Sequence, residues 1–170
     1  SVTNMAHMFS GATSANPDTS TWDTSSVTTM LGMFSGATSA NPDVRLWDIS
    51  NVTAIEYMFN GALSAIPDTS EWDPSSATSM DYLFAGAISA APDMSGWNLT
   101  SITSMYNMLE GIDIGTENYS SFLMQLLQTN NQIGLELNGG SAQYNAAGAE
   151  ARAVLISERG WIITDGGPNF

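Results

Sequence analysis

Carboxylates are the only chemically active side chains that this 170-residue sequence repeats at a fixed spacing. One file follows a proline every 25 residues, and a second file follows a tryptophan; they are Asp18, Asp43, Asp68 and Asp93, and Asp23, Asp48 and Asp73. Neighbouring copies would place like charges about 5 Å apart. Calcium accepts such oxygens, so the first file gives candidate calcium ligands. Asx turns, in which each carboxylate accepts nearby backbone amides, relieve the repulsion more simply.

Catalysis requires a nucleophile or an acid–base pair with partners at fixed distance. The only histidine, His7, occupies a position that varies between repeats, and the acids belong to repeated columns. An active site is normally a single unrepeated constellation. We therefore predict no catalytic residue, no enzyme and no cofactor, with calcium at the first aspartate file as the alternative to Asx turns.

The charge balance excludes several partners. Seventeen acids against three arginines, without lysine, give a net charge of −14, which repels nucleic acid and anionic membranes. The sequence contains no run of 18 apolar residues, so it does not predict membrane insertion. The absence of cysteine excludes disulfides and thiolate metal sites. We expect a monomer, and the abrupt start inside a repeat suggests a piece of a longer protein.

The carboxylates are positioned by an internal repeat of 25 residues. The segment "VTTMLGMFSGATSANPDVRLWDISN" has ungapped copies before and after it, so units start at residues 2, 27, 52, 77 and 102, and the pattern ends at Ile112. A fixed period of this length predicts a solenoid in which each unit buries its apolar side against its neighbours. We expect an α/β repeat solenoid over residues 1–112.

One half of each unit favours a short helix. Its apolar columns are spaced i, i+3, i+4, which places them on one face of two helical turns. A glycine follows, where a helix end needs a positive φ. The columns are Met5/Met30/Ile55/Met80/Met105, Met8/Met33/Met58/Leu83/Met108, Phe9/Phe34/Phe59/Phe84/Leu109 and Gly11/Gly36/Gly61/Gly86/Gly111.

The other half favours a "SANPD" turn and then a short strand that closes on Trp22, Trp47, Trp72 or Trp97. We interpret the tryptophan column as core; the alternative is a sugar-binding groove. After the tryptophan, an apolar residue alternates with Ser, Asn or Thr ("SVT", "NVT", "SAT", "SIT"). This alternation predicts two files of outward-facing Ser and Thr side chains, in which residues of neighbouring coils are about 4.8 Å apart.

Positions that vary between units are expected at the surface, where solenoids hold their partners. The predicted ligand face comprises the variable pairs on the strands: Ser20, Thr21, Arg45, Leu46, Ser70, Glu71, Ser95 and Gly96. The alternative exposed face is the outer side of the helices, with Tyr57, Tyr82 and Tyr106.

Residues 113–170 depart from the repeat and predict an α+β cap packed on the last coil. "ENYSSFLMQLLQTNN" favours a helix, "GLELNGG" a strand and turn, "NAAGAEARAVLISERG" a helix ending at Gly160, and "WIITDGG" a final strand. We expect Arg152 and Arg159 to pair with nearby acids.

The words "W-D-x-S-S-V-T-x-M-x-x-M-F-x-G-A" resemble the repeat of BspA-like leucine-rich-repeat surface proteins of bacteria over residues 1–112. The ending "LNGGSAQYNAAGAEARAVLISERGWIITDGG" looks like the tail of marine Gram-negative members. The resemblance implies a right-handed array of one short strand and one short helix per coil, on secreted or cell-surface proteins that act in adhesion. The chain departs from the commoner unit in carrying "SANPD" where many members have an aromatic residue and "NQD".

We therefore expect a noncatalytic, extracellular or bacterial cell-surface module that binds a protein or glycan on another cell or matrix. One alternative is a structural spacer within a larger surface protein. A further alternative is ice binding through the Ser/Thr files.

Overall fold

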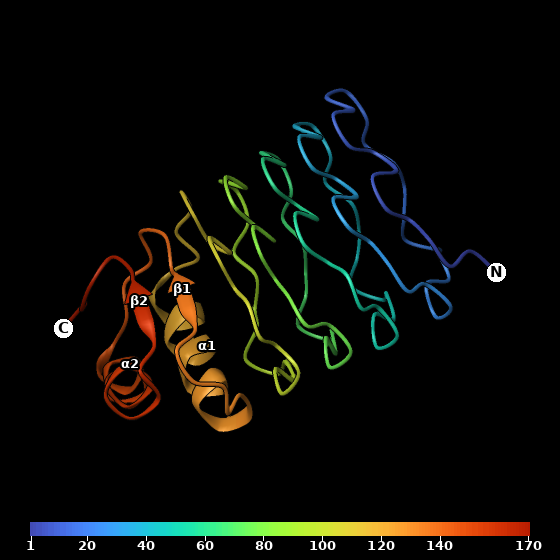
Figure 1. Ribbon diagram of the computed structural model, residues 1–170. Coiled ribbons are helices and arrows are strands. Elements are labelled where there is room, and N and C mark those ends of the chain that lie inside the picture. Colours follow the sequence, from blue (N-terminus) through green and yellow to red (C-terminus); the bar gives the residue numbers. More distant parts are fainter.

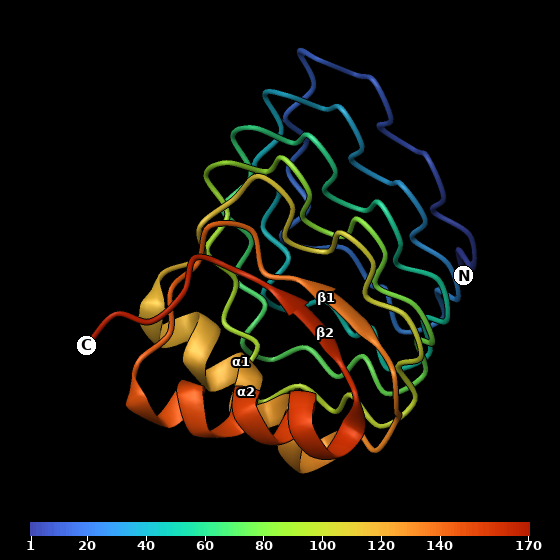
Figure 2. The same cartoon turned by 60° about the vertical axis from the view of Figure 1, so that its left-hand side comes forward.

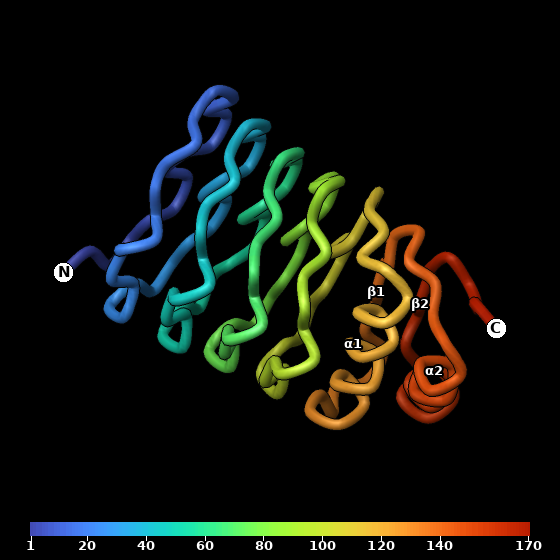
Figure 3. The backbone as a smooth tube through the Cα atoms, turned by 180° about the vertical axis from the view of Figure 1, so that it is seen from behind, coloured from blue at the N-terminus to red at the C-terminus, as the bar shows by residue number.

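The computed structural model describes all residues, 1–170, and its regular elements lie in the last third of the chain. These are helix α1 (Thr116–Thr129), strand β1 (Glu136–Asn138), helix α2 (Ala146–Arg159) and strand β2 (Ile162–Thr164). Residues 1–112 instead form a row of coils, one per repeat, stacked side by side (Figure 1). Seen from behind, the coils repeat one outline from the N-terminus to the cap (Figure 3).

The short helix predicted in each unit is wrong. Residues 5–11 and their copies carry a ladder of hydrogen bonds between coils, in which every second N–H donates to the following coil. In the first junction the bonds are Met5 to Thr29 O (3.0 Å), His7 to Leu31 O (2.9 Å), Phe9 to Met33 O (2.8 Å) and Gly11 to Ser35 O (2.7 Å). An isolated two-turn helix has only marginal stability. Stacking of the coils instead gives each of these N–H groups a carbonyl acceptor in the next coil.

The glycine column has the predicted positive φ, with values from 65° to 74° at Gly11, Gly36, Gly61, Gly86 and Gly111. These glycines do not end helices. They lie within the ladder, where a left-handed residue turns the chain between bridged positions, a conformation that costs glycine little.

The strand predicted before each tryptophan is also wrong. Asp18 begins an Asx turn, and the Trp22 N–H then donates to Thr19 O at 3.1 Å, so the segment is a succession of tight turns. Side chains join the coils on this side, as the Thr19 hydroxyl does to Asp43 O at 2.6 Å. The local hydrogen bonds of aspartate and serine compete with a strand ladder.

The core confirms the packing of the apolar columns. Trp47, Trp72 and Trp97 are at most 3% exposed, and the phenylalanine rings stack at 5.4 to 5.7 Å from coil to coil. Each of these indoles donates Nε1–H to a backbone carbonyl of the preceding coil, at 2.9 to 3.3 Å. These three tryptophans therefore do not line a sugar-binding groove. The apolar residues between the Ser/Thr files, Val27, Val52, Ala77 and Ile102, are fully buried, as predicted.

The cap contains the four elements that the sequence predicts, and it continues the ladder of the coils. Met105 bridges Leu137 of β1 in parallel, and β1 pairs with β2 (Figure 2). Buried Asn130, after α1, donates its amide to Leu99 O and Ile102 O at 2.9 and 2.8 Å. The last coil is thus covered by backbone pairing and by polar side chains.

The two arginines of the cap differ in their partners. Arg152 forms an ion pair with Asp165 at 2.7 Å, as expected. Arg159 does not pair with an acid; its guanidinium donates to Leu126 O, Leu127 O and Asn130 O at the end of α1. A cation placed there satisfies carbonyls that a helix end leaves free.

Isolated bridges and turns take the place of the strand and helix expected in each coil. The assignment of the array to the leucine-rich-repeat class therefore stays a prediction.

Candidate binding face

The tyrosines of coils 3 to 5 form a file along the ladder side of the array. Tyr57 and Tyr82 stack with ring centroids 4.9 Å apart, and Tyr106 meets Tyr82 edge-on at 5.6 Å. Tyr57 and Tyr106 are 41% and 43% exposed. We call these three residues, with the acids beside them (Glu56, Asp81, Glu110 and Glu136), the tyrosine face. Its three tyrosines are those that the sequence predicts on the alternative exposed face.

The backbone holds two of these tyrosines in a left-handed conformation. Tyr57 and Tyr82 have φ values of 58° and 56°, in the same column as Gly32 at 57°. Such a conformation costs a non-glycine residue roughly 1–2 kcal/mol. Gly32 shows that glycine fits this position, so the fold itself does not require tyrosine there. His7 and Asn107, in the same column, have φ values of 56° and 50°, so this conformation belongs to every coil and does not by itself mark the tyrosine face.

A shallow hollow of about 380 Å³ lies beside Tyr82. Three glycines of successive coils line it, Gly61, Gly86 and Gly111, together with Asn60, Ala85 and Glu110. A Cβ added at Gly86 would lie 3.7 Å from the Gly61 Cα, so these two glycines pack in van der Waals contact. Sequence reasoning missed Asn60 and Glu110 because their column was not singled out.

The electrostatics of the tyrosine face are negative. The neighbouring Tyr82, and then Glu136, raise the pKa of Tyr106 above its ordinary value of 10.0. Asp81 accepts the Tyr106 N–H at 2.8 Å through Oδ1. Oε2 of Glu56 is buried and has no hydrogen-bond partner. The tyrosines therefore sit among carboxylates that no basic side chain neutralises.

The predicted ligand face lies on the opposite half of the repeat, at the tight turns, and all eight of its residues are exposed. Leu46 is 67% exposed. A smaller hollow of about 220 Å³ lies nearby and includes Asp43 and Asp68, but none of the eight residues lines it. We call these eight residues the turn face. The structure thus exposes both candidate faces and gives only the tyrosine face a hollow lined by its own residues.

The aspartate files form Asx turns. Asp18 Oδ1 accepts the Ser20 hydroxyl at 2.7 Å and the Ser20 amide at 3.1 Å. The hydroxyl and then the amide lower the pKa of the Asp18 carboxyl. The same two bonds, in the same order, lower the pKa values of Asp23, Asp48 and Asp68. Asp43 and Asp93 accept only the backbone amides of Arg45 and Ser95. No three acidic or histidine side chains converge as a metal site would require.

The threonines of one polar file use their hydroxyl protons within the fold. Thr28, Thr53 and Thr103 each donate Oγ1–H to the carbonyl of the preceding coil, at 3.0 to 3.1 Å. In the second file Ser76 donates to Ser50 O at 2.5 Å. These hydroxyl donors are therefore occupied within the fold.

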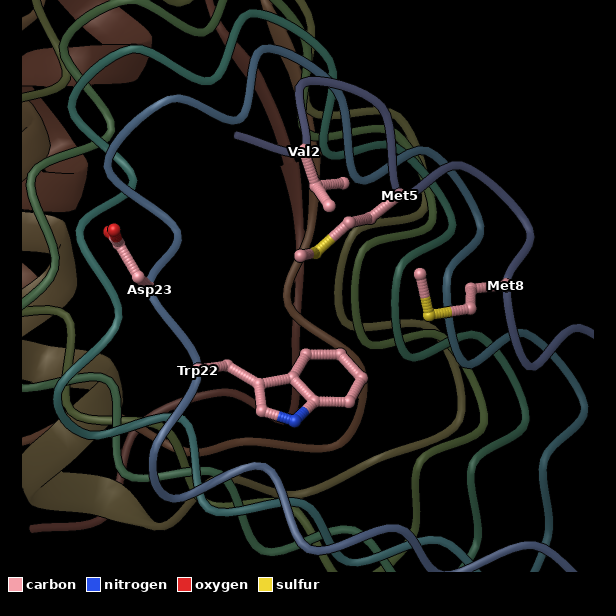
Figure 4. Close-up of a pocket in the computed structure, with 5 residues that line it drawn as sticks. All are labelled: Val2, Met5, Met8, Trp22 and Asp23. Atoms are coloured by element: carbon pink, nitrogen blue, oxygen red, sulfur yellow. The ribbon is translucent and has the colours of Figure 1, made fainter.

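The end of the first coil contains an apolar hollow of about 380 Å³ (Figure 4). Val2 and Met8 are 51% and 46% exposed there, whereas the equivalent residues of later coils are buried. Met5 and Trp22 project into the hollow, and the carboxylate of Asp23 turns away from it (Figure 4). This hollow is the uncovered cross-section of the core, with no convergent polar groups.

The repeats and the start of the cap match a model of a known protein family, described as Mycoplasma protein of unknown function, DUF285. The matches cover residues 1–66 and 42–133. The chain belongs to the DUF285 family. The tyrosine face lies almost wholly inside the matched residues, and Glu136 of β1 lies just beyond them. No curated protein matches this DUF285 chain, and neither does any solved structure. None of its helices has the length and apolar character needed to cross a membrane.

Proposed function

We propose that this DUF285 chain is a noncatalytic binding module that presents the tyrosine face to a ligand. The carrying observation is the file of Tyr57, Tyr82 and Tyr106 rings in contact from coil to coil, in which Tyr57 and Tyr106 are exposed and Tyr82 lines a hollow. Exposed aromatic side chains beside a hollow supply the contact area on which binding depends.

The setting of the module is part of the proposal. We propose, from its resemblance to BspA-like leucine-rich-repeat proteins, that the module belongs to a secreted or cell-surface protein and binds a protein or glycan on another cell or matrix. The repeat array supports this reading, since stacked coils create an extended surface on which neighbouring units contribute to one site. A structural spacer is the competing function. No observation favours ice binding, because the threonine hydroxyls donate to backbone carbonyls.

The test is a screen of the labelled chain against glycans and extracellular matrix proteins, with and without calcium. Two double variants accompany the wild type: Tyr57→Gly with Tyr82→Gly, and Arg45→Ala with Glu71→Ala. Glycine fits the backbone at both tyrosine positions. A ligand lost only in the tyrosine variant supports the proposal. A ligand lost only in the Arg45/Glu71 variant moves the site to the turn face, and no ligand under any condition favours the spacer.

A further inference from the structure

The tyrosine face carries an uncompensated negative charge that calls for a partner of opposite sign. Glu56 and Asp81 occupy one column in adjacent coils, each directly before a tyrosine, and Glu110 and Glu136 raise the pKa of Tyr106 by their proximity. The only ion pair of the chain joins Arg152 to Asp165 in the cap. Arg45 lies on the turn face and Arg159 binds the end of α1. All three arginines of this lysine-free chain are therefore placed elsewhere.

The cap shows which cation such a surface accommodates. Arg152 lies over the Tyr144 ring, with Cζ 5.3 Å from its centroid, while Nε donates to Asp165 at 2.7 Å. A guanidinium can contact an aromatic ring and bond a carboxylate at the same time, because it is planar and its donors lie in a fork. The tyrosine face offers the same two groups, with no arginine between them.

The hollow beside Tyr82 offers room for such a side chain. Glu110 and Asn60 line it, and the three lining glycines contribute no side chain that would have to move. An arginine side chain in this hollow can direct its head group toward the Glu110 carboxylate and the exposed Tyr106 ring, whose pKa Glu110 helps to raise. Placing the cation there gives a charge-assisted hydrogen bond together with ring contact.

We propose that the tyrosine face binds an arginine-bearing segment of a partner protein. The inference rests on the proposed binding function and names the ligand class of that same face. The net charge of −14 favours the encounter, since long-range attraction to a basic partner raises the association rate at low salt. Recognition then depends on the rings and carboxylates of coils 3 to 5 and β1.

The probe is a labelled 12-residue peptide, four repeats of Gly-Arg-Ser, with a matched peptide that carries glutamine in place of arginine. Binding to the full chain is measured by fluorescence anisotropy at 50 and 150 mM NaCl. We expect binding of the arginine peptide alone. Its Kd should rise about fivefold or more in the double variant Tyr57→Gly with Tyr82→Gly, because each substitution removes about one cation–π contact. A similar rise is expected in Glu110→Gln with Glu136→Gln, because each substitution removes about one charge contact.

The matched control is Glu150→Gln with Glu158→Gln, which removes the same charge from exposed residues of α2. Its Kd should change less than about twofold. An equal loss in this control would show non-specific attraction to an acidic chain and overturn the inference. Unchanged binding in the tyrosine variant would overturn it as well.

The screen separates failure of the inference from failure of the proposed function. A glycan or neutral protein lost in the tyrosine variant, without binding of the arginine peptide, leaves the binding function standing and removes the arginine ligand. If neither the screen nor the peptide gives a complex, both proposals fall.

Discussion

Asp48 illustrates how single residues stabilise the turns of the repeat. Its Oδ1 accepts the Ser50 hydroxyl at 2.6 Å and the Ser50 amide at 3.0 Å, and these bonds lower the pKa of the carboxyl from 3.8. A carboxyl whose pKa is lower in the folded chain stabilises the fold above its unfolded pKa. That contribution is lost as the pH falls through the folded pKa.

We expect Ser50→Ala to lower the free energy of unfolding at pH 7 and to have a smaller effect at pH 2, because the contribution of the Asp48 carboxyl is lost as the pH falls from its unfolded pKa through its lower folded pKa. Urea unfolding at a series of pH values measures the difference. Ser14→Ala, at an exposed position without a hydrogen bond to an aspartate, is the control and should match the wild type throughout. A Ser50→Ala deficit that stays constant from pH 7 to pH 2 contradicts the assigned bond.

Among the elements, the sequence predicted the cap better than the coils. The cap helix Ala146–Arg159 begins with an Asn145 side chain that accepts the Gly148 amide and ends at Gly160 with φ 67°. Those signals are local and can be read directly. The segment 5–11 carries an equally clear i, i+3, i+4 pattern and forms no helix, because its N–H groups bond to residues 24 positions later. A local period cannot reveal a partner supplied by the next coil.

The candidate site was predictable to a similar degree. Comparing repeat copies correctly identified Tyr57, Tyr82 and Tyr106 as exposed or partly exposed. It could not show that the rings stack, that two of them have positive φ, or that glycines of three coils line a hollow beside Tyr82. These features depend on the stacking of coils and on backbone geometry that no single column encodes.

The arginine at the end of α2 links the two cap helices. Arg159 donates to Leu127 O at 2.8 Å and to two further carbonyls near the end of α1. We expect Arg159→Met to lower the free energy of unfolding by about 1–3 kcal/mol, since the apolar stem is kept and the charged donors are lost. Glu158→Gln, one residue earlier and exposed, should change it by less than about 0.5 kcal/mol. Urea midpoints that coincide for the two variants would contradict the linking role.

At the scale of the whole molecule, one core connects the coils to the cap. A single cluster of 42 buried residues extends from Met5 to Ile163. Each coil touches only its neighbours, so stability is approximately a sum of coil and junction contributions. Burial is therefore not uniform along the array: Phe59 in coil 3 is fully buried between two coils, whereas Phe9 in coil 1 has a coil on one side only.

Because of this asymmetry, we expect the same Phe→Ala substitution to lower the free energy of unfolding by different amounts in different coils. Phe59→Ala removes a ring stacked on both Phe34 and Phe84 and should cost about 3–5 kcal/mol, the range for large-to-small core substitutions. Phe9→Ala removes a partly exposed ring with Phe34 on one side, and we expect less than half that loss. Urea unfolding measures both values, and hydrogen exchange should show the amides of coil 1 opening first. Equal costs at the two positions would mean that the first coil is as firmly held as the third, and the nearest-neighbour account of the array would then fail.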